Sequence, residues 1–165
     1  MMNSIVLTGI SGSGKTTVAE ILSSKLNFGF VDIDFIIEQK EKCSISEIFE
    51  IKGEEYFRTL ESDTIEEVLD ENQVIALGGG AFENEKIRNL LLSKTNVFYL
   101  KTSPQTVLNR LKDKHDRPLL QDISLDKILS MLNRREKHYE LAHYTVLTDN
   151  KSSNEVVKEI LKCLN

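Results

Sequence analysis

Residues 9–16 are the clearest chemical signal in this sequence. Their order, Gly-Ile-Ser-Gly-Ser-Gly-Lys-Thr, fits the pattern G-x-x-x-x-G-K-S/T, which cradles the phosphates of a nucleoside triphosphate. Glycines let the backbone approach an anion closely, and N–H groups of the loop and of the following helix then point at phosphate oxygens. The Lys15 ammonium can reach the β- and γ-phosphates, and the Thr16 hydroxyl can bind Mg²⁺. The motif predicts nucleoside triphosphate binding and leaves the phosphate acceptor open.

Two carboxylates, Asp32 and Asp34, lie at the end of a second predicted strand, residues 28–33. Ligands of open α/β sheets bind outside the carboxyl ends of the strands, where the phosphate loop also lies. Residues two apart on a strand share a face, so both side chains can point toward the loop. One carboxylate would hold Mg²⁺ through water, and the other would accept a hydrogen bond from an acceptor hydroxyl. The alternative is helix capping, because Asp34 precedes residues 35–38.

Three consecutive glycines, residues 78–80, end the third predicted strand at the same edge of the sheet. Such a run loses conformational entropy on folding, so it needs a structural reason. Either a ligand approaches the backbone closely, or the chain turns tightly into the next helix. Arg58 and Arg135 lie on predicted helices. The simpler interpretation of each is a solvated charge, with Arg58 as an i,i+4 partner of Glu54.

A polar segment of mixed charge, residues 110–120, connects two predicted helices. Loops of this kind beside a phosphate-binding core often close over the substrate as lids. In a mobile lid at about 112–122, Arg117 would neutralise charge on the transferred phosphoryl group. Arg110 would stack on the nucleotide base or hydrogen-bond to it. The alternative is a disordered connector.

The elements that position these residues alternate between strands and helices, which indicates an α/β fold with a parallel sheet. We expect a single doubly wound domain with a five-stranded parallel sheet. The strands are expected at 4–8, 28–33, 73–77, 96–100 and 144–147. The helices are expected at 15–26, 53–70, 84–92, 104–111, 123–139 and 153–164.

Length and composition favour one globular domain: the chain has 165 residues, of which 40% are hydrophobic and 28% charged. No apolar run approaches the roughly 18 residues needed to cross a membrane, and no secretory leader is visible, so we expect a cytoplasmic protein. The net charge of −5 argues against nucleic-acid or membrane binding. The second half of the chain is nevertheless net positive, which suits a small anionic ligand. Cys43 and Cys163 are expected to be free thiols.

Taken together, these pieces resemble shikimate kinase, a small member of the P-loop fold of the nucleoside-monophosphate kinases. The resemblance extends from residue 5 to residue 161. The matching pieces are GISGSGKT at 9–16, DID at 32–34, FRTLE at 57–61, GGGA at 78–81, NRL at 109–111, RPLL at 117–120, and Arg135 with Tyr139. Each piece is ordinary alone, but their order and spacing are specific.

The resemblance implies a role for each matched residue. The nucleotide would be bound by Gly12, Ser13, Gly14, Lys15, Thr16, Thr17, Arg110 and Arg117. Mg²⁺ would be bound by Thr16 and Asp32. Shikimate would be bound by Asp34, Arg58, Gly78, Gly79, Gly80 and Arg135. The acceptor-binding region would extend over about residues 32–61. Guanidinium groups suit its carboxylate because they are planar, bidentate and permanently charged. The catalytic residues would be Lys15, Asp34 and Arg117.

The resemblance also implies the reaction: transfer of the γ-phosphoryl group of MgATP to the 3-hydroxyl of shikimate, a step of aromatic amino acid biosynthesis. Such transfer has a loose transition state, in which positioning and charge neutralisation matter most. Asp34 would therefore orient the hydroxyl and accept its proton late. We expect a monomer. The alternatives are another small-molecule kinase of this architecture, such as a gluconate or nucleoside-monophosphate kinase, and a nucleotide-dependent switch without acceptor chemistry.

Two departures from the family pattern affect individual residues. The family usually has R-x-P-x-Y where this chain has Arg-Glu-Lys-His-Tyr at 135–139. Arg134 is therefore a second candidate for the position of Arg135, although the spacing to Tyr139 favours Arg135. The expected adenine loop, residues 149–154, lacks the proline often present, so the role of Lys151 there is open.

Overall fold

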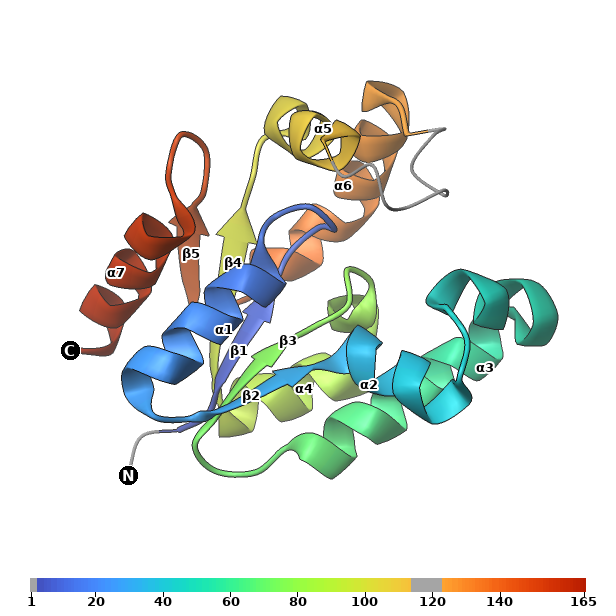
Figure 1. Cartoon of the computed structure of the whole chain (residues 1–165), viewed down its shortest axis with the longest axis horizontal. Helices are drawn as coiled ribbons and strands as arrows, with labels where there is room; N and C mark the ends of the chain where they lie inside the picture. The colour runs from blue at the N-terminus through green and yellow to red at the C-terminus, as the bar shows by residue number, and fades with distance from the viewer. Residues whose placement is uncertain (1–2, 114–122) are drawn as a thin grey trace.

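The centre of the protein is a sheet of five parallel strands in the order β2-β3-β1-β4-β5 (Figure 1). The computed structural model describes residues 3–113 and 123–165. The strands are β1 (Ile5–Thr8), β2 (Gly29–Asp32), β3 (Gln73–Ala76), β4 (Asn96–Lys101) and β5 (Tyr144–Leu147). Because β1 is the middle strand, the loop that follows it lies at the centre of the carboxyl edge of the sheet. The predicted five-stranded parallel sheet is confirmed.

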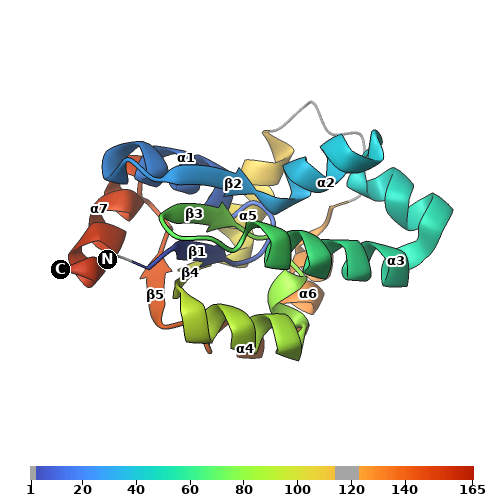
Figure 2. The same cartoon turned by 90° about the horizontal axis from the view of Figure 1, so that it is seen from below.

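Helices cover both faces of this sheet, and Figure 2 shows α1 and α4 on opposite sides of it. The helices are α1 (Lys15–Leu26), α2 (Ile33–Glu41), α3 (Ile45–Val68), α4 (Glu85–Lys94), α5 (Pro104–Lys112), α6 (Leu125–Tyr139) and α7 (Ser153–Leu164). Alternate residues of β1 point to different cores: Ile5 and Leu7 pack with α1 and α7, whereas Val6 packs with the helices of the other face. A strand buried on both faces reads as a continuous apolar run, which is how β1 was predicted.

The region after β2 differs from the prediction, because it contains two helical segments that the apolar pattern did not indicate. The strand ends at Asp32 and α2 begins at Ile33. The helix predicted at 53–70 begins already at Ile45, with a kink at Gly53, whose φ and ψ are 85° and 166°. Ser44 and Glu47 form a capping box at the start of this helix. That S-x-x-E pattern was the available signal for the missed segment.

The predicted lid at 112–122 falls almost wholly outside the described residues, and Arg117 lies there too. The described chain stops just after Lys112, the last residue of α5, and resumes at Ile123. Among the described residues, no helix combines the length and apolar character that crossing a membrane requires.

Candidate active site

The phosphate loop connects the end of β1 to the start of α1. Gly12 and Gly14 have φ of 86° and 91°, a region that residues with a Cβ rarely adopt. Gly14 is the N-cap of α1, and no side chain of the described residues caps the helix start. The first N–H groups of α1 therefore point toward the loop and have no side-chain acceptor. An anion-binding site requires such available donors.

Lys15, the first residue of α1, folds back over this loop. Its Nζ donates to the carbonyl oxygens of Gly9 (2.6 Å) and Ile10 (3.0 Å), and the residue is 8% exposed. Hydrogen bonds from an ammonium group to carbonyl oxygens are charge-assisted and hold the group in place. The positive charge therefore lies at the loop, where the phosphates of a bound triphosphate would be placed.

Asp32 connects the phosphate loop to α2 through its two carboxylate oxygens. Its Oδ2 accepts a hydrogen bond from the Thr16 hydroxyl (2.6 Å), and its Oδ1 accepts from the backbone N–H of Phe35 (3.0 Å), which caps α2. The prediction that Asp32 and Asp34 share a strand face is wrong, because β2 ends at Asp32 and Asp34 lies in the first turn of α2. Helix capping, the alternative interpretation of this pair, is the role of Asp32, which contacts Thr16 at the same time.

The three glycines at 78–80, here called the glycine turn, connect β3 to the short helix η1 (Ala81–Glu83). A Cβ on any of them would come within 3.2 Å of a charged side chain from another element. Such a Cβ would lie 2.7 Å from Oδ1 of Asp34 at Gly78, 3.2 Å from Nη1 of Arg135 at Gly79, and 2.5 Å from Nη2 of Arg58 at Gly80. The chain does turn tightly here, and three charged groups from α2, α3 and α6 also lie against its backbone. The structure therefore brings Asp34, Arg58 and Arg135 together.

Asp34 has an unusual electrostatic environment for a carboxylate. Burial raises the pKa of its carboxyl above the ordinary value of 3.8, and the neighbouring charge of Asp32 raises it further. The positive charges of Lys15 and Arg58 oppose this rise in the pKa. Asp34 thus lies within the electrostatic reach of both the phosphate loop and the glycine turn. A carboxylate with a raised pKa is a better proton acceptor than an exposed one.

Arg58 is held by a carboxylate from its own helix. Its Nη1 donates to Oε1 of Glu61 at 2.8 Å, whereas the contact with Glu54 is at 3.5 Å and involves an exposed partner. The guanidinium also lies over the rings of Phe49 (5.8 Å) and Phe57 (5.2 Å). The predicted surface pair with Glu54 is therefore the weaker of its two contacts.

Glu61 is a residue of this site to which the sequence alone assigned no role. Its side chain is buried, and this burial raises the pKa of its carboxyl. No group among the described residues donates a hydrogen bond to its Oε2. A Cβ on Gly78 would lie 3.0 Å from that oxygen, so Glu61 reaches the glycine turn beside Asp34. Its i,i+3 spacing to Arg58 on one helix was the available signal.

Arg135 and Arg134 differ in where the structure places them. Nε of Arg135 pairs with Oε2 of Glu83 at 3.1 Å, and Nε of Arg134 pairs with the other oxygen, Oε1, at 3.3 Å. The side chain of Arg135 is 11% exposed and that of Arg134 is 63% exposed. Arg135, which also approaches Gly79, is therefore the arginine that lies at the glycine turn.

A cavity of about 430 Å³ lies on the other side of the phosphate loop, between α1, α5 and the start of α7. Arg110 lines it and donates to the carbonyl oxygens of Gly12 and Thr148, both at 3.3 Å. The other lining residues are Gly12, Ser13, Gly14, Thr17, Val18, Asp113, Thr148, Lys151, Ser152, Ser153 and Val156. The expected adenine loop, residues 149–154, thus contributes three of the residues that line this cavity beside the phosphate loop.

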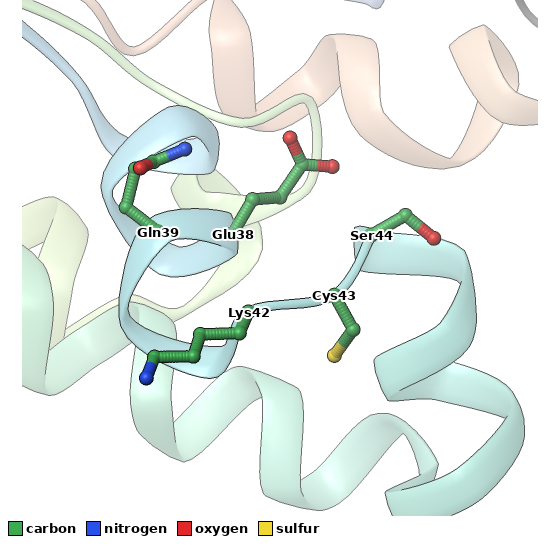
Figure 3. A pocket seen from close by; sticks show the side chains of 5 residues that line it. All are labelled: Glu38, Gln39, Lys42, Cys43 and Ser44. Atoms are coloured by element: carbon green, nitrogen blue, oxygen red, sulfur yellow. The ribbon is translucent and has the colours of Figure 1, made fainter.

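A second hollow, of about 460 Å³, lies where the chain passes from α2 to α3 (Figure 3). Glu38, Gln39, Lys42, Cys43 and Ser44 line it. Oε1 of Glu38 accepts a hydrogen bond from the backbone N–H of Ile45 at 3.0 Å, so this carboxylate holds the connection between the two helices. The hollow contains none of the predicted site residues, although it lies within the expected acceptor-binding region, 32–61.

Comparisons with known proteins agree with this geometry. The shikimate kinase family model matches residues 11–165. A shikimate kinase from Sulfurihydrogenibium sp. (strain YO3AOP1) is 45% identical over 161 residues, which cover 97% of this chain and 96% of that protein. The structure of a shikimate kinase from Acinetobacter baumannii in complex with shikimate has a TM-score of 0.91 at 35% identity, covering 99% of this chain and 93% of that one. A gluconokinase from Sinorhizobium meliloti 1021 has a TM-score of 0.65 at 20% identity, covering 98% and 91% of the two chains, a likeness of fold alone.

Proposed function

The chain belongs to the shikimate kinase family, and from this premise we propose that it transfers the γ-phosphoryl group of ATP to the 3-hydroxyl of shikimate. The products are ADP and shikimate 3-phosphate. The observation that carries the proposal is the meeting of Asp34, Arg58 and Arg135 at the glycine turn, beside the phosphate loop. One carboxylate and two guanidinium groups match an acceptor that has hydroxyls and a carboxylate.

The phosphate side of the site would hold ATP. The loop backbone and Lys15 would bind its phosphates, and Arg110 with the neighbouring cavity would receive the adenine. Arg117, which lies outside the described residues, would contact the phosphates from the lid. Every group in this set belongs to one chain, so we propose that a monomer suffices.

Thr16 and Asp32 fit a Mg²⁺ ion. Their oxygens lie 2.6 Å apart beside the phosphate loop, and no three acidic, histidine or cysteine side chains of the described residues are placed so that together they could hold a metal ion. Mg²⁺ typically takes one or two protein oxygens together with water and substrate phosphates, so this sparse set suits it. A bound Mg²⁺ would neutralise charge on the phosphates.

Asp34 would orient the acceptor hydroxyl. Its carboxylate would accept a hydrogen bond from the 3-hydroxyl, so that the oxygen lies in line with the γ-phosphorus. As the new P–O bond forms and the bond to ADP breaks, the hydroxyl proton would pass to Asp34. A loose transition state needs little activation of the nucleophile, so orientation outweighs base strength, and the raised pKa favours late proton uptake. Arg58 and Arg135 would hold the acceptor carboxylate.

An acceptor panel tests this function directly. ADP release would be measured by a coupled assay with shikimate, gluconate, a nucleoside monophosphate, or no acceptor. We expect stimulation by shikimate alone, together with formation of shikimate 3-phosphate. Stimulation by gluconate or by a nucleoside monophosphate would favour another kinase of this fold. Nucleotide binding without stimulation by any acceptor would favour a switch.

A further inference from the structure

The hydroxyl of Tyr139 connects α6 to the glycine turn. Tyr139 is the last residue of α6, its side chain is fully buried, and its hydroxyl donates to the carbonyl oxygen of Gly79. Burial raises the pKa of this phenol to about 12, so the hydroxyl remains a donor at neutral pH. Buried tyrosine hydroxyls usually find a partner, and here the partner is the backbone of the turn that carries the acceptor-binding groups.

This contact determines the direction of a second backbone group. The carbonyl of Gly79 and the N–H of Gly80 belong to one peptide group, which is trans because the described chain contains no cis peptide bond. In a trans peptide these two groups point in opposite directions. Tyr139 lies in the hydrophobic core, so a carbonyl directed at its hydroxyl directs the N–H of Gly80 away from the core. Glycine on both sides of this peptide would otherwise leave it free to rotate.

The N–H of Gly80 is not used to close the turn. The closing hydrogen bonds run from Ala81 N–H to Gly78 O (3.3 Å) and from Glu83 N–H to Gly80 O (3.1 Å). No acceptor among the described residues meets the N–H of Gly80. Arg58 lies against Gly80 itself, so this donor is next to a guanidinium group that would bind the acceptor.

We infer that Tyr139 is a positioning residue for the acceptor: its hydroxyl holds the Gly79–Gly80 peptide so that the N–H of Gly80 donates to an oxygen of bound shikimate. The inference rests on the proposed function, because it requires an acceptor at the glycine turn. Tyr139 acts through the backbone and does not touch the substrate. Its removal therefore affects acceptor binding and leaves nucleotide binding unchanged.

Two tyrosine-to-phenylalanine variants test this inference. Tyr139→Phe removes the hydroxyl and keeps the ring. Tyr99→Phe is a matched control, because Tyr99 is equally buried and packs on Tyr139 (5.1 Å between ring centroids), but its hydroxyl meets Glu136 at 3.4 Å. For Tyr139→Phe we expect KM for shikimate to rise about tenfold, as for the loss of one orienting hydrogen bond. We expect KM for ATP to change less than about twofold, and Tyr99→Phe to resemble the wild type.

Equal effects of the two variants, or equal changes in the two KM values, would overturn the positioning role. A second measurement uses the wild type and does not depend on a folded variant. In glycine-selective ¹⁵N NMR spectra, saturating shikimate should shift the amide resonance of Gly80, and an unshifted resonance would overturn the inference. If the wild type does not phosphorylate shikimate in the same assay, the proposed function fails as well. If the wild type is active and Tyr139→Phe matches it, only the positioning role fails.

Discussion

Replacing Gly80 by alanine places one methyl group against Arg58. A Cβ at this position would lie 2.5 Å from Nη2, and ordinary contact begins at 3.4 Å, so the guanidinium must move by about 1 Å. The φ and ψ of Gly80, −101° and −7°, are accessible to alanine, so the backbone itself is not strained. Misplacement of a binding group by about 1 Å can reduce catalysis by about a hundredfold. We therefore expect KM for shikimate to rise between about 10- and 100-fold, about 1.4 to 2.8 kcal/mol of binding free energy.

The assay compares this effect with nucleotide binding and with a remote control. KM for ATP and Kd for ADP should remain close to the wild-type values, because the atoms nearest to the added methyl group all belong to Arg58, on the acceptor side of the site. Gly29→Ala is the control: its Cβ would lie 2.1 Å from the end of the flexible Gln73 side chain, at the amino ends of β2 and β3, opposite the site. Gly29→Ala creates similar crowding, and we expect it to leave both KM values unchanged.

The reasoning fails if folded Gly80→Ala protein binds shikimate as well as the wild type does. It also fails if KM for ATP rises in parallel, because the methyl group would then disturb the whole site. A change of Tm smaller than about 4 °C would show that the variant is folded.

Four further predictions concern the two aspartates. Asp34→Asn should reduce kcat with shikimate at least about 100-fold while Kd for ADP stays the same, which steady-state kinetics and calorimetry can separate. The Asp34 carboxyl can accept a proton only when it is ionised, that is, above its raised pKa. kcat of the wild type should therefore fall as pH is lowered through that pKa. The residual kcat of Asp34→Asn should not show this fall. The same rise in pKa makes ionised Asp34 unfavourable for the folded state. Its contribution to the free energy of unfolding is fully present below pH 3.8 and is lost as pH rises through the folded-state pKa. Asp34→Asn should therefore have a higher Tm than the wild type at pH 7, and this difference should disappear in acid. Asp32→Asn keeps an oxygen to cap α2 but removes the charge, so Tm should change little while the Mg²⁺ concentration for half-maximal activity rises several-fold.

The scaffold was largely predictable because its signals are local. Short apolar runs that alternate along the chain with helical patterns indicated the five strands. The phosphate loop depends on glycines and a lysine that are close together in sequence. The region between β2 and β3 was less predictable. A nine-residue helix, α2, follows β2 without a break, and Gly53 interrupts α3. The apolar pattern across these elements is too short or too interrupted to reveal a helical period.

The acceptor side of the site depends on contacts between distant parts of the chain. From their sequence context alone, Arg58 and Arg135 were each interpreted as a solvated charge. Only the resemblance of the chain to the shikimate kinases implied that they bind the acceptor. In the folded chain, both guanidinium groups and the Asp34 carboxylate lie against one glycine turn. The sequence by itself determined the parallel sheet and the phosphate loop, since short-range pattern and backbone conformation are encoded by neighbouring residues. The tertiary structure alone decided which charges share a site, because helices from different parts of the chain bring them together only when they pack on the sheet.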